Sequence, residues 1–503
     1  MDASRHLIDP INLLKKDKAS LYILCLFVVF RMMWAAFVPL GADEAYYFDW
    51  SKDIHLSYYD HPPGVSWLAW TGQQIFGVNW FGARVGSIFA HFLSTLLLIR
   101  AYTLLYKDIS KSGLRAIVCM SSFFPILSVG GFFIMPDLGL MLFISMMMVH
   151  CTQLATKKRL RAFDGISLGI LFGLSFCFKY HGLAIGGGLC LGLLIIRRRE
   201  LLKELNFWIL LTLTPFLAAF PVFYWNAQNE WISFVYQSGH GFANPSFDYK
   251  LGLRTLLAQF VLLTPVGMVL FLKTIIRPIR GNPLEAILYW GAAPLAILLT
   301  GLSFFKEVLP HWAVPTVWVC LPLIARIVVQ EKPRFLKTNM VFGAFLTLTI
   351  PSLLSLDSGR SFILKSVLKE RPGALAELTL WDFLLSDDNV QTSLRTANTG
   401  NCQVSFASSR WFSTSQIAAR QDEIKVYNLN TRKPSYYSFR DDLPPAPGCP
   451  VIYLSQSKYF DKKSLETYID IQETTKFYPR LHKDQEIIMA KGVWKTLTKK
   501  KSL

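Results

Sequence analysis

Acidic side chains are concentrated between Asp43 and Pro63, in the sequence DEAYYFDWSKDIHLSYYDHPP. This segment follows an apolar run, residues 21–40, that is long enough to cross a bilayer. Aromatic side chains are interleaved with the acids, a composition typical of a segment at the membrane interface. A carboxylate held there could act as a base or as an electrostatic anchor for a substrate carried by a lipid. The alternative is a solvated loop with interfacial aromatic residues.

Two short motifs within this segment carry the candidate groups. Asp43 is the candidate catalytic carboxylate, and the adjacent Glu44 would point elsewhere if both lie on a helix. Helix N-capping by Asp43 is the other interpretation. Asp60 and His61 precede two prolines, which favour an extended backbone at His61. An imidazole fixed in this way could bind a lipid phosphate, or the motif is a plain interfacial turn.

A second group of ionisable residues follows later in the chain. Asp137, in IMPDLGL, lies where one apolar run ends and another begins. An acid near two membrane spans is costly and usually functional, although helix capping would also explain it. Lys179 and Tyr180, followed by His181, lie between two short apolar runs. Lys179 could bind phosphate or extend its ammonium group to the interface.

Three further residues are candidates for the same face of the membrane. His240 lies in the sequence QSGHGF, and Glu307 follows Lys306 in KEVLPHW. A single histidine is structural more often than it is catalytic. Arg84 lies four residues into an apolar run and therefore needs an anion or water nearby.

The composition indicates a polytopic membrane protein. Of the 503 residues, 52% are hydrophobic and only 17% are charged, against about 25% charged in soluble proteins. The net charge of +18 comes mainly from short basic clusters between apolar runs. That placement fits membrane topology and anionic lipids rather than nucleic acid. No nucleotide-binding, serine-hydrolase or zinc motif occurs in a suitable context, so nucleotide-dependent and serine-hydrolase functions have no support. No cofactor is required, because protein cations can stabilise a lipid phosphate leaving group, although the acidic loops could bind a divalent ion.

Apolar runs predict eleven transmembrane spans, of which two are short for a bilayer of about 30 Å. The distribution of lysine and arginine tests this assignment of spans, because both residues are enriched in cytoplasmic loops. With the N-terminus inside, the inner segments contain 21 of these residues and the outer segments four. The N-terminus is therefore expected in the cytoplasm, with the acids on the outer face. The predicted spans are 21–40, 80–105, 116–134, 138–156, 163–178, 183–196, 206–225, 251–272, 284–303, 312–329 and 339–356.

The composition changes near residue 357. Segments 402–408, 424–430 and 451–457 resemble short strands, and 414–421 resembles a helix. We therefore expect a soluble α/β domain over 357–503 on the outer side. Cys402 and Cys449 could pair there if the compartment is oxidising. The preceding membrane domain is expected to span 1–356, with outer loops at 41–79, 226–250 and 304–311.

Taken in order, these motifs resemble GT-C glycosyltransferases of the dolichyl-phosphate-mannose protein mannosyltransferase superfamily. The bacterial branch, which includes lipid A aminoarabinose transferases, is the most similar. The resemblance extends over the whole chain. It rests on the Asp-Glu after the first span, YYDHPPGVSWL, FGARVGS, MPDLGL, the Lys-Tyr pair, QSGHGF, KEVLPHWAVP and FASSRWFSTSQIAAR.

The resemblance implies an inverting transfer of sugar from a polyprenyl phosphate on the side away from the cytoplasm. It assigns Asp43 as the catalytic residue and His61 to the donor phosphate, with Lys179 and Arg84 as further phosphate ligands. His61 stands where the aminoarabinose transferases carry lysine, and histidine is only a conditional cation near neutral pH. The residues expected to line the substrate cavity are Glu44, Asp60, Asp137, Tyr180, His240 and Glu307.

The expected function is transfer to a lipid-linked acceptor, such as lipid A, lipopolysaccharide or another glycan, at the periplasmic face of a bacterial inner membrane. The partners would be the donor lipid, the acceptor and the surrounding membrane lipids. A protein O-mannosyltransferase is an alternative, although 226–250 is too short for the added domain of eukaryotic members. A lipid-sugar transporter would distribute polar residues through the spans, whereas here they collect at one face. An assembly protein with a degenerate site is the third alternative, but Asp43 is present.

Overall fold

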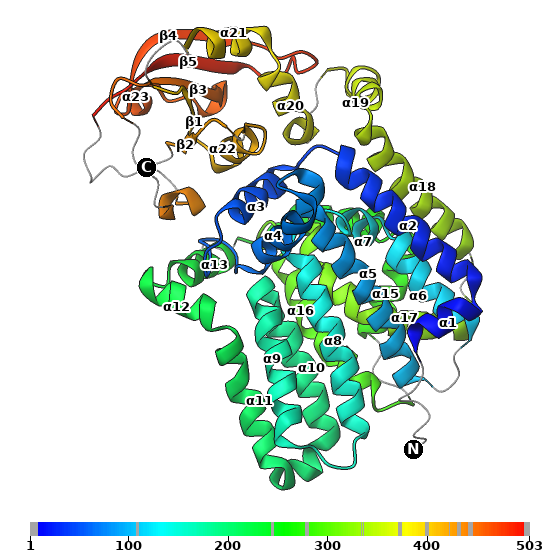
Figure 1. Ribbon diagram of the computed structural model, residues 1–503. Coiled ribbons are helices and arrows are strands. Elements are labelled where there is room, and N and C mark those ends of the chain that lie inside the picture. The colour runs from blue at the N-terminus through cyan, green and yellow to red at the C-terminus, as the bar shows by residue number, and fades with distance from the viewer. Residues whose placement is uncertain are drawn as a thin grey trace. The chain divides into compact units, whose positions relative to one another are not determined.

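The computed structural model describes residues 9–106, 110–242, 246–276, 281–332, 334, 336–370, 375–397, 402–421, 423–429, 434–440 and 446–496. These residues form two compact units (Figure 1). The first comprises residues up to 36 together with 55–351 and is helical, whereas the second joins 37–54 to the tail that begins at residue 352. Part of the first predicted outer loop therefore packs with the tail. The predicted division at residue 356 stays a prediction.

The helices of the first unit follow the apolar runs of the sequence. They are α1 (Pro10–Lys16), α2 (Lys18–Phe37), α4 (Gly64–Phe76), α5 (Trp80–Leu105), α6 (Lys111–Phe123), α7 (Pro125–Gly130), α8 (Pro136–Thr156), α9 (Ala162–Phe178), α10 (His181–Arg197), α11 (Leu205–Ala218), α12 (Phe220–Gln228), α13 (Ile232–Phe242), α14 (Tyr249–Leu262), α15 (Pro265–Ile276), α16 (Glu285–Leu302), α17 (Val314–Glu331) and α18 (Leu336–Ser355). The last residue of α2 and the end of α18 belong to the second unit.

Within the described ranges, seven helices are long and apolar enough to cross a membrane, or nine if two bent pairs each count as one span. The chain is thus a polytopic membrane protein, but the predicted count of eleven is not confirmed. Helix α9 has 17 residues, about 25 Å at 1.5 Å per residue. The run at 116–134 is divided because Pro125 begins a new helix, α7.

The run predicted as one span at 251–272 contains a sharp bend. Helices α14 and α15 meet at an angle of 113°, and Thr264 between them has a positive φ of 66°. Pro265 begins α15. The side chain of Asn339 accepts from the Val266 N–H at 3.0 Å and so satisfies a backbone donor that the break releases. The predicted span at 251–272 is therefore a bent pair of helices, which is either a broken span or a re-entrant loop.

Arg31 stabilises the break between α6 and α7. Its guanidinium is fully buried and donates to the carbonyl oxygens of Ser128 and Ser121 at 3.3 and 3.5 Å. The ring of His91 lies 3.1 Å away. A buried cation here is therefore solvated by carbonyl oxygens near the C-terminal ends of α6 and α7.

The second unit contains a five-stranded sheet with the order β2-β1-β3-β5-β4. The first three strands are parallel, and β5 is antiparallel to both of its neighbours. Three predicted strands and the predicted helix are found within a few residues, whereas β4 and β5 were not predicted. The elements are α3 (Ala42–Lys52), α19 (Asp357–Phe362), α20 (Ala376–Leu385), α21 (Asp388–Ala397), β1 (Ser405–Ser408), α22 (Trp411–Ala418), β2 (Val426–Asn428), β3 (Pro450–Gln456), α23 (Lys462–Leu465), β4 (Ile469–Phe477) and β5 (Ile487–Trp494).

Both faces of this sheet are covered by apolar side chains. Ile452 and Leu454 pack with α20 on one face, while Val451 and Tyr453 pack with Trp494 on the other. This alternation is the period-two pattern of a strand buried on both sides. A disulfide joins Cys402 to Cys449, 47 residues apart, at the edge of the second cluster.

Replacing Cys402 with serine should lower the free energy of unfolding of this sheet by about 2–4 kcal/mol, because the crosslink limits the unfolded chain. Hydrogen exchange of the β3 amides should report the loss, and reductant added to the wild-type protein should reproduce it. Cys25→Ser is the matched control because Cys25 is an exposed free thiol. Unchanged exchange in Cys402→Ser would show that the disulfide does not stabilise the sheet.

Candidate functional site

Helix α3 carries Asp43 near its N-terminus. Gly41 is the N-cap residue, and its N–H donates to the Glu44 carboxylate at 3.2 Å. Glu44 is buried, whereas Asp43 is exposed as the second residue of the helix. The N-capping interpretation of Asp43 is therefore wrong, since Glu44 is the residue that satisfies the cap. Asp43 is thus an acid in the first turn of α3, at the positive end of the helix dipole.

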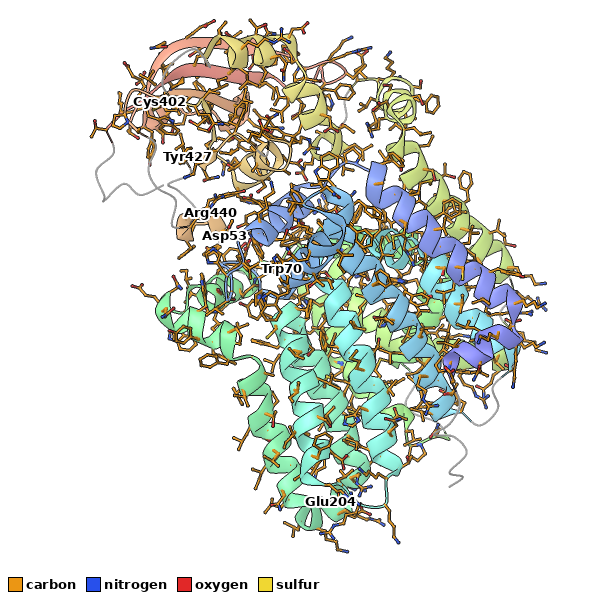
Figure 2. All side chains as sticks on the ribbon, viewed as in Figure 1. Asp53, Trp70, Glu204, Cys402, Tyr427 and Arg440 are labelled. Carbon is orange, nitrogen blue, oxygen red and sulfur yellow. A yellow bond between two sulfur atoms is a disulfide. The ribbon has the colours of Figure 1, made fainter. Side chains whose placement is uncertain are left out.

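The opposite end of α3 is anchored to the tail within the second unit. The Tyr437 hydroxyl donates to the Asp49 carboxylate at 2.8 Å. Arg440, labelled in Figure 2, forms an ion pair with Asp49 at 3.3 Å. The backbone N–H of Tyr436 donates to the Tyr46 hydroxyl at 2.7 Å. Burial and the neighbouring Asp49 raise the pKa of Tyr437 well above its usual value, so this hydroxyl keeps its proton. The tail thus fixes the helix that carries Asp43.

A buried ion pair lies in the first unit, where α9 ends and where α8 and α10 begin. The Lys179 ammonium donates to both Asp137 oxygens, at 2.8 and 2.9 Å, and each residue is only 3% exposed. His181 and His311 are close enough to interact electrostatically with this pair. His61 in turn interacts with His181. The structure therefore collects one acid, one lysine and three histidines.

Close packing around Phe178 brings these residues together. Phe178 immediately precedes Lys179, and its ring lies where a Cβ at Gly64 or Gly139 would be. Gly139 follows Asp137 on α8, and Gly64 follows the His61 segment at the start of α4. Because only glycine leaves room for the ring at both positions, the sequence here specifies a close approach of α4, α8 and α9.

The segment that carries His61 is anchored to α13. The Gln237 amide donates to the Asp60 carbonyl oxygen at 2.5 Å, and the Ser233 hydroxyl donates to the Tyr58 carbonyl oxygen at 2.9 Å. Two buried prolines follow His61 and lead into α4. These contacts hold the backbone of the predicted phosphate ligand in place.

An apolar cavity of about 800 Å³ opens beside this cluster, between α9, α10, α11 and α13. Aromatic and aliphatic side chains form most of its wall, while Tyr180 and Gln237 are among its few polar lining residues. Tyr180 lies between Lys179 and His181 in the chain, and Gln237 holds Asp60. The cavity therefore has an apolar body and a polar end close to the ionised cluster, as ligand sites commonly do.

Three other predicted site residues have different surroundings. Arg84 is fully buried, donates to the Ala35 carbonyl oxygen at 3.1 Å and faces the Phe132 ring at 5.5 Å. Glu307 pairs with Arg254 at 2.6 Å, and both side chains are exposed. His240 lies on α13, but its side chain is outside the described residues.

The sequence singled out His181 and His311 only as neighbours of other candidates. Both histidines directly flank an apolar span, which is the signal that could have found them. No group of three or more His, Cys, Asp or Glu side chains in the described part of the chain could hold a metal ion.

Comparison with known proteins shows that this chain is similar to glycosyltransferases. The family model described as dolichyl-phosphate-mannose-protein mannosyltransferase matches residues 60–225. A lipid A galacturonosyltransferase of Rhizobium johnstonii is 25% identical over 66% of this chain and 70% of its own length. An undecaprenyl phosphate-aminoarabinose arabinosyl transferase of Yersinia enterocolitica is 28% identical over 39% of this chain and 37% of its own length.

Among solved structures, the aminoarabinose transferase ArnT of Cupriavidus metallidurans in its apo state has a TM-score of 0.56 at 11% identity. That match covers 95% of this chain and 98% of the other. The same transferase bound to undecaprenyl phosphate has a TM-score of 0.54 at 14% identity, with coverages of 93% and 97%.

The fold and the matches define the class of this chain as a polytopic membrane protein with the GT-C fold of ArnT. Within that class, the family model and the relatives confirm the resemblance to the bacterial branch of the dolichyl-phosphate-mannose protein mannosyltransferase superfamily.

Proposed function

We propose that this chain is an inverting glycosyltransferase that moves a sugar from a polyprenyl-phosphate donor to a lipid-linked acceptor. The acceptor class is lipid A, lipopolysaccharide or a related glycan. Relatives named as lipid A galacturonosyl- and aminoarabinosyltransferases support this assignment. The observation that carries it is the cluster of Asp137, Lys179 and His61 with its neighbouring histidines, beside an apolar cavity of about 800 Å³.

In this proposal, Asp43 accepts the proton of the acceptor hydroxyl. The hydroxyl oxygen attacks the anomeric carbon, and the bond from that carbon to the phosphate oxygen breaks with inversion. The polyprenyl phosphate leaves with the bonding electrons, and His61 stabilises its charge together with Lys179. The apolar cavity accommodates part of the lipid tail. The reaction balances without a cofactor.

Two observations support a bacterial inner-membrane location with the reaction on the periplasmic face. Lysine and arginine collect in the predicted inner segments, which favours a cytoplasmic N-terminus. The Cys402–Cys449 disulfide favours an oxidising compartment for the tail. We propose that the tail is a periplasmic α/β domain that positions α3. The loops 226–250 and 304–311 would face the same compartment.

Mass spectrometry of membrane lipids and glycoproteins from cells with and without the chain tests this function. We expect one added sugar on a lipid acceptor only when the chain is present. The same mass on a protein would instead identify a protein O-glycosyltransferase. Lipid-linked sugar that merely changes leaflet, with no new glycoconjugate, would identify a transporter.

His61→Ala should raise the apparent KM for the polyprenyl-phosphate sugar about tenfold with a smaller change in kcat, because a charge-assisted hydrogen bond to the phosphate is lost. His61→Lys should restore or improve donor use, since lysine is fully charged near neutral pH. Donor titrations with purified protein would measure both. His55→Ala is the control, as His55 lies in the same segment. An unchanged donor dependence in His61→Ala would exclude phosphate contact.

Tyr437→Phe should lower kcat several-fold without changing the KM for donor, because it removes the hydroxyl that holds Asp49 on α3. Tyr453→Phe is a matched control that loses a 2.8 Å hydrogen bond to Ser409, in β3 and away from α3. Both variants should lose about 1–2 kcal/mol of stability in the tail. Equal kinetic effects would show that Tyr437 stabilises the tail without positioning α3.

A further inference from the structure

A second, polar cavity of about 320 Å³ lies at the end of the α8–α11 bundle opposite the Asp137–Lys179 ion pair. It lies where α9 and α11 begin, and Glu204, labelled in Figure 2, is in its wall. Helix α9 separates this end from Lys179 by 17 residues, about 25 Å. The cavity therefore lies at the other membrane boundary from the ionised cluster and is distinct from it.

Three exposed cations line this cavity. Arg159 and Arg161 come from the turn before α9, and Lys203 comes from the segment before α11. The amide side chain of Asn206 adds a neutral donor. These groups are donors that suit a phosphate, and arginine can bind it through two parallel hydrogen bonds.

The acids near the cavity are already neutralised. Both Glu204 oxygens accept from Arg197, one of them from the Nε at 3.0 Å, and the Leu160 N–H also donates to the carboxylate at 2.9 Å. Asp164 accepts from Lys157 at 2.7 Å. The surroundings therefore keep an excess of positive charge. Eight cations stand against three acids in this region: Lys157, Lys158, Arg159, Arg161, Arg197, Arg198, Arg199 and Lys203 against Asp164, Glu200 and Glu204.

Apolar side chains are exposed directly beside these cations. Phe163 is 74% exposed and Leu202 is 85% exposed, and Leu205 is also exposed. Phe163 follows the two cavity arginines on α9, and Leu202 and Leu205 flank Lys203. Binding of a soluble anion would require only the cations. A surface that joins cations to exposed apolar residues at the ends of membrane-spanning helices matches a molecule with a charged head and acyl chains.

We propose that this cavity binds the phosphodiester headgroup of an anionic phospholipid, such as phosphatidylglycerol, in the membrane leaflet at the basic end of the bundle. The headgroup lies against Arg159, Arg161 and Lys203. The acyl chains lie along Phe163 and Leu202. Binding of this lipid joins α9 to α11 and stabilises the bundle without taking part in sugar transfer, so the inference does not depend on the proposed function.

Native mass spectrometry of the delipidated full chain, titrated with phosphatidylglycerol or phosphatidylcholine, tests this site. Removing Arg159, Arg161 and Lys203 by glutamine substitution should weaken phosphatidylglycerol retention by about fivefold per cation and leave phosphatidylcholine retention unchanged. The matched control replaces Lys158, Arg198 and Arg199 with glutamine. These substitutions remove the same charge in the same region, but the three residues do not line the cavity. This control should retain phosphatidylglycerol.

Thermal unfolding gives a second readout. Phosphatidylglycerol should raise the unfolding midpoint of the wild type and of the control, but not of the cavity variant. Equal loss of binding in both triple variants would show a diffuse charge effect and overturn the site. Competition by inorganic phosphate as effective as by phosphatidylglycerol would show a site for a small anion and overturn the lipid assignment. Circular dichroism of each variant establishes that it is folded.

Discussion

Asp43→Asn should lower the rate of sugar transfer by about 10²–10⁴-fold and leave the protein folded, because general-base catalysis contributes an effect of that size. The asparagine amide has nearly the shape of the carboxylate but cannot accept the acceptor's proton. Asp43 is exposed near the start of α3, whereas Glu44 satisfies the helix cap. The substitution therefore removes a reactive group and leaves the cap intact. The measurement is transfer from a labelled polyprenyl-phosphate sugar by purified protein.

Two matched variants separate chemistry from structure in this experiment. Asp53→Asn removes an exposed acid at the other end of the same helix and should retain transfer. Glu44→Gln weakens the cap and should cost about 1 kcal/mol of helix stability. Transfer that persists in Asp43→Asn would refute its role as the base. A loss shared by Asp53→Asn would point to the general negative charge of α3.

The sequence was informative where one local pattern sufficed. Apolar runs located the helices, and two prolines marked the fixed segment at His61. Period-two patterns located β1 and β3. Strand β4, with the sequence IDIQETTKF, escaped because most of its side chains are polar and at least partly exposed. A strand with so little apolar alternation resembles a loop until its partner β5 is known.

Contacts between distant segments could not be predicted in the same way. Asp49 meets Tyr437 and Arg440 across almost four hundred residues, so nothing local indicated that α3 packs with the tail. Arg84 was expected to need an anion or water nearby, and the structure adds a carbonyl oxygen and aromatic faces that the sequence did not indicate. Either environment stabilises a buried guanidinium, and the sequence does not distinguish them.

Asp137→Asn should lower the free energy of unfolding of the helical unit by about 3–5 kcal/mol, because Lys179 would remain buried without its counter-charge. Lys179→Gln should have a similar effect by isolating Asp137. The double variant Asp137→Asn/Lys179→Gln removes both charges and should recover most of that stability. Thermal unfolding of the three proteins measures this coupling, which double-mutant cycles isolate.

The double variant also decides whether the pair serves transfer or only folding. If the pair only stabilises the bundle, the double variant should recover activity together with stability. We expect the double variant to be stable but inactive. In the proposed reaction Lys179 leaves Asp137 and binds the donor phosphate, and the double variant lacks this cation. The buried pair Arg197–Glu204, at the far end of the same bundle, is the matched control. Neutralising both of its members should alter stability but retain transfer, since that pair lies about 25 Å from the cluster. Active enzyme in the Asp137–Lys179 double variant would make this ion pair purely structural and leave His61 as the principal phosphate ligand.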